Sequence, residues 1–146
     1  MFARPPETDI KEKLMTSSIT RRAVNAPDAP QTAARRYAQA VEISGASRTL
    51  YISGQIPVGA DGHMPEDFES QARLAWANVE AQLRAAGMSL DNLVKLTVFL
   101  AGYEHRDINA KVRWEVMGDR TIALSTIITG AYDPAWLIEI EGIAVA

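Results

Sequence analysis

The 146-residue sequence contains no cysteine, which excludes disulfide bonds, thiolate nucleophiles and cysteine-based zinc sites. Histidine is nearly absent too: His63 and His105 are the only two, so a histidine-rich metal site is not expected. His63 is expected to be a solvated loop residue and His105 to start a helix. No stretch approaches the roughly 20 apolar residues that a membrane-spanning helix needs.

The sequence also lacks a large excess of positive or of negative charge. The chain has 15 Lys and Arg against 18 Asp and Glu, a net charge of -3, and it has no basic block. This balance favours neither nucleic acid nor an acidic membrane surface as a partner. The segment from Met1 to Leu14 carries Pro-Pro and several acids instead of the apolar run of a signal peptide, so we expect a cytoplasmic protein.

The length is close to that of a typical single domain and allows a substantial core. Neither an internal repeat nor a linker divides the chain. We therefore expect an N-terminal arm over residues 1–18, with a short helical turn near Ile10 and Leu14, followed by one domain over residues 19–146.

Two stretches have the periodicity of amphipathic helices. Between Glu66 and Ala86, apolar residues recur every three or four positions, and Gly87 provides a helix stop. Trp76 is expected at the border of this apolar stripe. The second helix is predicted from His105 to Met117, where the apolar residues one turn apart are Ile108, Val112 and Val116.

Strands are predicted on both sides of these helices. Their approximate ranges are 19–24, 38–43, 49–53, 94–101 and two within 122–146, the last two joined by a Gly-Ala-Tyr-Asp-Pro turn. The loop of about four residues after Ile43 predicts a hairpin between the second and third of them. Together these elements indicate a two-layer α+β domain, with both helices on one face of a mainly antiparallel sheet.

The last strand contains the most informative pair of residues. Glu139 and Glu141 are two positions apart, so their carboxylates should lie on one face of the strand, beside apolar neighbours. Because burying an unpaired charge is costly, these carboxylates require a partner, a proton or an open cavity. Lys95, Thr97 and Phe99 are expected on the same mixed face, which another subunit would cover.

Several motifs in consistent register resemble those of the Rid family, the reactive-intermediate deaminases, also called YjgF-like or L-PSP endoribonuclease-like proteins. The resemblance extends from about Ile19 to the C-terminus. The matching pieces are Tyr37-Ala-Gln-Ala-Val41, Ser53-Gly-Gln-Ile-Pro57, Gln71 with the alanine-rich helix up to Gly87, Val94-Lys-Leu-Thr-Val-Phe99, Asn109, and Glu139-Ile-Glu-Gly-Ile-Ala144.

This resemblance implies a chorismate-mutase-like, ferredoxin-like fold and a homotrimer whose sheets form a barrel. It places small-molecule sites in the clefts between subunits, without a metal or an organic cofactor. The activity it implies is hydrolysis of enamines and imines, such as 2-aminoacrylate, to 2-keto acids and ammonia.

The resemblance also suggests site residues. The water-orienting glutamate of the family matches Glu139, and its other pocket residues match Tyr37, Ser53, Gly54 and Asn109. The segment Ile122-Ala-Leu-Ser-Thr126 replaces the Pro-Ala-Arg-Ser/Thr pattern of the family. Thr126 is therefore expected to contact the substrate, and Leu124 stands where the family has the arginine that grips a carboxylate.

Leucine provides neither the charge nor the forked donors of arginine, so we expect little activity on 2-aminoacrylate. Arg120 is too early in the sequence to restore this clamp, whereas Arg35 or Arg36 could supply charge from another direction. Glu141 is expected to be a structural partner, for example of Lys95. The predicted pocket suits a neutral or less acidic molecule, with Tyr132 and Trp136 as further aromatic walls or simply as packing of their turn.

Three functions remain open from the sequence. The first is a divergent hydrolase of the deaminase type that acts on an enamine or imine. The second is a non-catalytic binding or regulatory protein for a small molecule. The third, ribonuclease or translation-inhibitor activity, is disfavoured by the acidic balance and by the lack of a basic, aromatic surface.

Overall fold

The structure, a computed structural model, describes residues 18–146, so the predicted helical turn near Ile10 and Leu14 lies outside the described residues. Its strands are β1 (Thr20–Val24), β2 (Ala40–Ser44), β3 (Thr49–Gln55), β4 (Leu93–Leu100), β5 (Ala123–Ile128) and β6 (Ile138–Val145). Its helices are α1 (Phe68–Ala85) and α2 (Arg106–Met117), with short 3-10 turns η1 (Ala33–Arg35), η2 (Leu90–Asn92) and η3 (Tyr103–His105).

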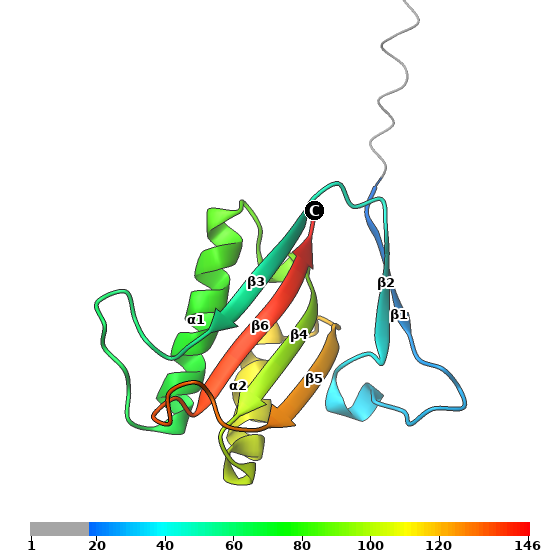
Figure 1. Ribbon diagram of the computed structural model, residues 1–146. Coiled ribbons are helices and arrows are strands. Elements are labelled where there is room, and N and C mark those ends of the chain that lie inside the picture. The colour runs from blue at the N-terminus through cyan, green and yellow to red at the C-terminus, as the bar shows by residue number, and fades with distance from the viewer. Residues whose placement is uncertain (1–17) are drawn as a thin grey trace, which may run out of the picture.

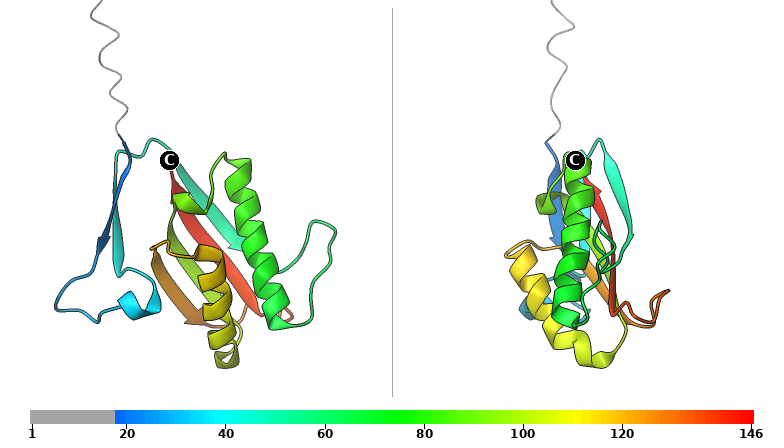
Figure 2. Two further views of the ribbon diagram at one scale, coloured as in Figure 1. Left: turned by 180° about the vertical axis from the view of Figure 1, so that it is seen from behind. Right: turned by 90° about the vertical axis from the view of Figure 1, so that its left-hand side faces the viewer.

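The main sheet has four strands in the order β3-β6-β4-β5. Two of its pairings, β3 with β6 and β6 with β4, are antiparallel, and β4 pairs with β5 in parallel. Both helices lie on one face of this sheet, and the other face is open (Figures 1 and 2). The predicted α+β class, with a mainly antiparallel sheet and helices on one face, is confirmed.

The predicted hairpin between residues 38–43 and 49–53 is wrong. β2 pairs instead with β1 in a separate two-stranded sheet, and β3 pairs with β6. The connection between β2 and β3 is tied to the C-terminus, because the backbone N–H groups of Ser47 and Arg48 donate to the carbonyl of Ala146 at 2.8 and 2.7 Å. These contacts direct the chain after β2 toward β6, and the local turn sequence does not reveal them.

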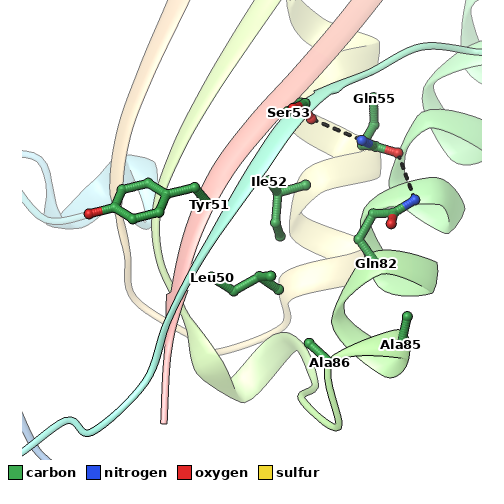
Figure 3. Close-up of a pocket in the computed structure, with 8 residues that line it drawn as sticks. All are labelled: Leu50, Tyr51, Ile52, Ser53, Gln55, Gln82, Ala85 and Ala86. Carbon is green, nitrogen blue, oxygen red and sulfur yellow. Dashed lines mark hydrogen bonds between the residues drawn. The ribbon is translucent and has the colours of Figure 1, made fainter.

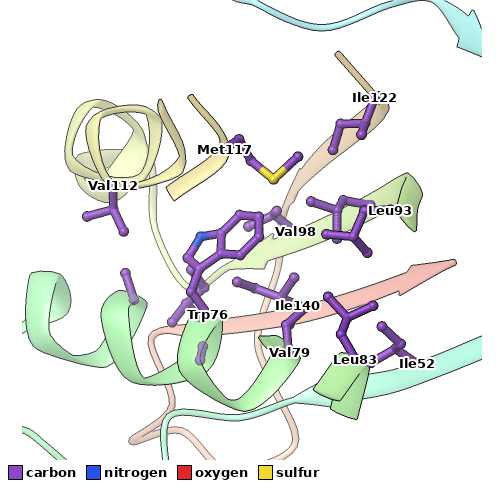
Figure 4. Packing of buried hydrophobic residues seen from close by; sticks show 14 of the residues in the cluster. Ile52, Trp76, Val79, Leu83, Leu93, Val98, Val112, Met117, Ile122 and Ile140 are labelled. Carbon is purple, nitrogen blue, oxygen red and sulfur yellow. The ribbon is translucent and has the colours of Figure 1, made fainter. Parts of the chain in front are cut away.

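The core lies between the helices and the inner face of the sheet (Figure 4). Along β6, Ile138 and Ile140 are buried, whereas Glu139 is half-buried and Glu141 is exposed, as strand alternation predicts. Trp76 is not at the border of the helix: it is 1% exposed and packs inside the cluster, beside Val79 and Met117. None of the helices within residues 18–146 is long and apolar enough to cross a membrane.

Helix α2 is rotated relative to its predicted apolar stripe. Ile108 is 38% exposed, whereas the buried positions are Asn109, Val112, Arg113 and Met117. Two of these four side chains are polar. They are buried because they face the segment before β2 across the edge of the sheet.

Gln71 on α1 ties the loop before α1 to the loop before β6. Its side chain is 1% exposed, donates to the carbonyls of Pro65 (2.9 Å) and Ala135 (3.1 Å), and accepts from the N–H of Leu137 (2.9 Å). These bonds fix the start of the strand that carries Glu139.

We expect Gln71→Leu to lower the free energy of unfolding by about 2–4 kcal/mol, because buried backbone groups lose their partners. Urea denaturation followed by circular dichroism measures this change. Gln82→Leu is the matched control, since Gln82 is on the same helix but exposed. Equal stability of the Gln71 and Gln82 variants would contradict the prediction.

Candidate functional site

Four of the seven predicted site residues line one cavity at the edge of the main sheet. These residues are Tyr37, Asn109, Leu124 and Thr126, and the cavity measures about 330 Å³. It lies where β5, α2 and the segment before β2 meet. Its size is at the lower end of the range for small-molecule sites.

The segment containing Tyr37 is held against β5 by backbone contacts. The N–H of Ala38 donates to the carbonyl of Ile122 at 2.9 Å, and Ala38 forms an isolated parallel bridge with Ala123. From within the segment, the hydroxyl of buried Thr32 donates to the carbonyl of Tyr37 at 2.8 Å. Tyr37 comes just before this bridge and Leu124 just after it, and both line the cavity.

Arg113 holds the same segment from α2. Its Nη1 and Nη2 atoms donate to the carbonyls of Arg36 (3.3 Å) and Arg35 (3.1 Å). The backbone of Arg36 has a left-handed φ of 55°, a conformation that costs a non-glycine residue about 1–2 kcal/mol. Its guanidinium lies 5.1 Å from the centre of the Trp114 ring. Of the two arginines proposed from the sequence, Arg35 lines the cavity and Arg36 stacks on the tryptophan.

The cavity contains more positive charge than the sequence suggested. Arg35, Arg106 and Arg113 all line it, and none of its lining residues is acidic. Burial lowers the pKa of the Arg113 guanidinium, an effect that nearby Tyr37 opposes and Arg36 reinforces. Sequence reasoning missed Arg106 and Arg113. The available signal was the four-residue spacing from Asn109, which places Arg113 on the same face of α2.

Ser53, Gly54 and Glu139 form a second group on β3 and β6, apart from this cavity. A Cβ added at Gly54 would overlap the Oε1 atom of Glu139, so only glycine lets this carboxylate lie over the β3 backbone. Glu139 is half-buried and stands opposite Phe99 in the β4–β6 register. Strand β4 separates β6 from β5. The two groups therefore do not meet within one chain.

Glu139 belongs to the open face of the sheet, where the predicted mixed set of side chains is found. Lys95, Thr97 and Phe99 are half-buried there, and β4 pairs Thr97 with Glu141. The ammonium of Lys95 donates to the hydroxyl of Ser125 (2.9 Å) and to the carbonyl of Leu96 (3.0 Å). Burial lowers the pKa of Lys95, and the Glu141 carboxylate opposes that shift. Glu141 thus interacts with Lys95 through space, without a direct ion pair between them.

Large apolar side chains are exposed on or beside this open face. Tyr51 on β3 is 76% exposed, and Ile127 on β5 is 45% exposed. They lie on the two edge strands of the sheet, and half-buried Phe99 and Ile143 lie on the strands between them. Apolar side chains are therefore spread across the open face as well as packed in the core.

A further hollow of about 420 Å³ lies between β3 and the C-terminal end of α1 (Figure 3). Gln55 bridges its two sides, donating to the carbonyl of Ser53 (2.9 Å) and accepting from Gln82 (3.3 Å). The ring of Tyr51 points away from Gln82, to the other side of β3. No charged residue lines this hollow, so it offers no carboxylate, imidazole or ammonium group as a general acid or base.

Other residues considered from the sequence lie elsewhere. Tyr132 is 96% exposed, and its ring is 6.4 Å from that of Trp136 in the same turn. Neither aromatic lines the Leu124 cavity of the same chain. Arg120 pairs with Asp91 at 2.6 Å. His63 is exposed, and His105 stacks on Phe68 with ring centres 4.3 Å apart. Within residues 18–146, no cluster of three His, Asp or Glu side chains could hold a metal ion.

Comparison with known proteins identifies relatives over most of the chain. The model of the family described as "Endoribonuclease L-PSP" matches residues 26–146. The 2-iminobutanoate/2-iminopropanoate deaminase of Capra hircus is 34% identical over 131 residues, which cover 88% of this chain and 93% of that protein. A crystal structure of the Rid-family protein YyfB of Yersinia pestis, of unknown function, superposes with a TM-score of 0.75 at 27% identity, covering 86% of this chain and 98% of that one.

TdcF of Escherichia coli, provisionally named as a reactive intermediate deaminase, is 42% identical over 65 residues. That alignment covers 44% of this chain and 48% of TdcF, so the chain spans about half the length of this curated relative. The crystal structure of TdcF, which has serine bound, superposes over 86% of this chain and 94% of that one, with a TM-score of 0.63 and 31% identity.

Proposed function

Because the chain belongs to the Rid family of endoribonuclease L-PSP-like proteins, we propose that it hydrolyses a small enamine or imine in clefts between the subunits of a homotrimer. The division of the predicted site residues into two groups is the observation that carries this proposal. Tyr37, Asn109, Leu124 and Thr126 line the cavity at β5, whereas Ser53, Gly54 and Glu139 lie on β3 and β6.

A second subunit resolves this separation. If the open faces of three chains pack together, the β5 edge of one chain can approach β3 and β6 of the next. The exposed Tyr51 and Ile127 would then be covered, which removes apolar surface from water. Each cleft would combine the cavity of one subunit with the glutamate of its neighbour. A stable monomer at micromolar concentration in sedimentation velocity would contradict this arrangement.

The chemistry requires a positioned base and no cofactor. Glu139 holds a water molecule against the carbon of the C=N bond and takes one of its protons as the oxygen attacks. That proton passes to the nitrogen and gives a carbinolamine. The proton of the new hydroxyl then moves to the nitrogen as well, the C–N bond breaks, and ammonia leaves while the carbon becomes a carbonyl. Asn109 and Tyr37 orient the substrate from the other side of the cleft. An enamine enters the same route after its carbon is protonated to give the imine.

Gly54→Ala tests the placement of Glu139, because the added methyl group occupies the position of the carboxylate. We expect the hydrolysis rate to fall about 100-fold with little change in stability, since a displacement of about 1 Å can cost that much. Ammonia release measures the effect. Gly130→Ala is the matched control, because a Cβ there meets nothing within 4 Å and Gly130 has no left-handed backbone. Equal rates for the two variants would contradict the assigned role.

Leu124 restricts the substrate. With no guanidinium at this position of β5, a carboxylate directly next to the reacting carbon has no partner there. We therefore propose that 2-aminoacrylate and its imine tautomer, 2-iminopropanoate, are poor substrates. A non-catalytic binding protein is the alternative, and it predicts ligand binding without turnover.

A further inference from the structure

The cavity beside Leu124 has two buried polar atoms without partners. Arg113 is 6% exposed and its Nε atom has no hydrogen-bond acceptor. Asn109 is 5% exposed and its Oδ1 atom, as the amide is oriented, has no donor. Leaving such groups unpaired is costly, so they are usually satisfied by a ligand or by water. A ligand that satisfies both must carry an acceptor group and an N–H or O–H group.

The charges around the cavity indicate that the acceptor group of the ligand is an anion. Arg35 and Arg106 join Arg113 in its walls, and no lining residue is acidic. Two of the five N–H groups of Arg113 donate to the carbonyls of Arg35 and Arg36, which fixes the guanidinium plane and leaves further donors for an anion, the unpaired Nε among them. Repulsion among three cations is relieved when an anion binds between them.

We propose that Arg113, together with Arg35 and Arg106, binds a carboxylate of the substrate, and that α2 thereby supplies the positive charge that β5 lacks at Leu124. Only the statement that this ligand is a substrate rests on the proposed function. The anion site itself does not depend on catalysis. Asn109 accepts a hydrogen bond from a donor group on the same molecule.

The burial of the cavity residues determines where the carboxylate must lie within the substrate. Arg113 is at the buried end of the cavity, whereas Leu124 is half-buried and Thr126 is exposed. The glutamate of a neighbouring subunit can enter only from the open side. The substrate must therefore extend from the buried guanidinium to the mouth, with its carboxylate several bonds from the reacting carbon. Imines of dicarboxylic keto acids, such as 2-iminoglutarate, have this shape. Their distant carboxylate, which 2-iminopropanoate lacks, reaches the arginines, whereas the carboxylate next to the reacting carbon gains no charged partner from Leu124.

Calorimetric binding of glutarate and glutaramide to the full-length chain tests the site without any turnover. These probes share a skeleton, and only glutarate is charged. We expect glutarate to bind at least about tenfold more tightly than glutaramide, because the arginines contact a desolvated carboxylate. Its affinity should also weaken as salt is raised, whereas that of glutaramide should not.

Arg113→Met and Arg106→Met should each weaken glutarate binding about tenfold or more. Arg106 is exposed, so its variant tests the site even if Arg113→Met fails to fold. Arg120→Met makes the same charge change at a residue that pairs with Asp91 outside the cavity, and its affinity should equal that of the unchanged protein. Equal binding of the two probes, or wild-type affinity in Arg106→Met and in every folded Arg113 variant, would overturn the proposal.

The two proposals fail in distinguishable ways. If glutarate binds as expected but no imine is hydrolysed, the anion site stands and the enzymatic function is wrong. If neutral imines are hydrolysed but glutarate does not bind, the function stands and the anion site is wrong.

Discussion

Replacing Glu139 by glutamine is expected to lower the hydrolysis rate about 10²–10⁴-fold, the usual contribution of a positioned general base. Glutamine keeps the size and hydrogen-bonding shape of the side chain but cannot take a proton from water. The neutral side chain should still fit over Gly54, where the carboxylate now lies, so the fold and the trimer should persist. The assay follows 2-oxoglutarate formation from 2-iminoglutarate, which L-glutamate oxidase produces in the same solution.

Glu141→Gln is the matched control. It removes the same charge from the same face of β6, two residues along, at an exposed position. Its rate should remain close to that of the unchanged protein. A similar loss of hydrolysis rate in both variants would show that the negative charge of β6, and not a specific role of Glu139, causes the effect. Unchanged turnover in Glu139→Gln would exclude Glu139 as the base, and ligand binding without any turnover in the parent protein would favour the binding function.

Leu124→Arg is expected to raise kcat/KM for 2-iminopropanoate by a factor of roughly 30 or more. A charge-assisted contact in a cleft contributes about 2–5 kcal/mol, and 2 kcal/mol corresponds to about 30-fold. The new guanidinium would provide a forked donor on β5 for the carboxylate next to the reacting carbon. Repulsion from Arg113, which lines the same cavity, holds the gain near the lower end of this range.

Two variants separate the effect of the clamp from simpler causes. Leu124→Met changes the side chain without adding charge, and Thr121→Arg adds the same charge at an exposed position just before β5, outside the cavity. Neither should improve turnover of 2-iminopropanoate. A gain with Thr121→Arg equal to that with Leu124→Arg would show that overall charge matters more than position. No gain with a folded Leu124→Arg would mean that this position does not contact the carboxylate.

The elements that follow local periodicity were predictable from the sequence. The alternation of Leu96, Val98 and Leu100 on β4 identified the buried face, and Gly87 identified the end of α1, where its φ is +68°. The pairing of β2 was not predictable, because the contact of Ser47 with Ala146 joins residues 99 positions apart. Local turn chemistry carries no information about such a contact.

The candidate site likewise contains contacts that the sequence alone could not predict. Resemblance to a known family placed Tyr37, Asn109 and Thr126 in one cavity with Leu124, but it could not reveal Arg113. Helix periodicity assigns an arginine to the solvent side by default. Here the carbonyls of Arg35 and Arg36 accept from the guanidinium, which allows it to be buried. Long-range polar contacts of this kind require the fold.

The shared cleft is the central claim, and subunit mixing tests it most directly. Chains with Glu139→Gln and chains with Asn109→Leu, each inactive alone, are refolded together in equal amounts and assayed with 2-iminoglutarate. In random trimers, about one cleft in four receives an intact cavity from one variant and an intact glutamate from the other. We predict that the mixture recovers about a quarter of the parent activity per chain. A mixture as inactive as its two components, although mixed trimers form, would contradict the account.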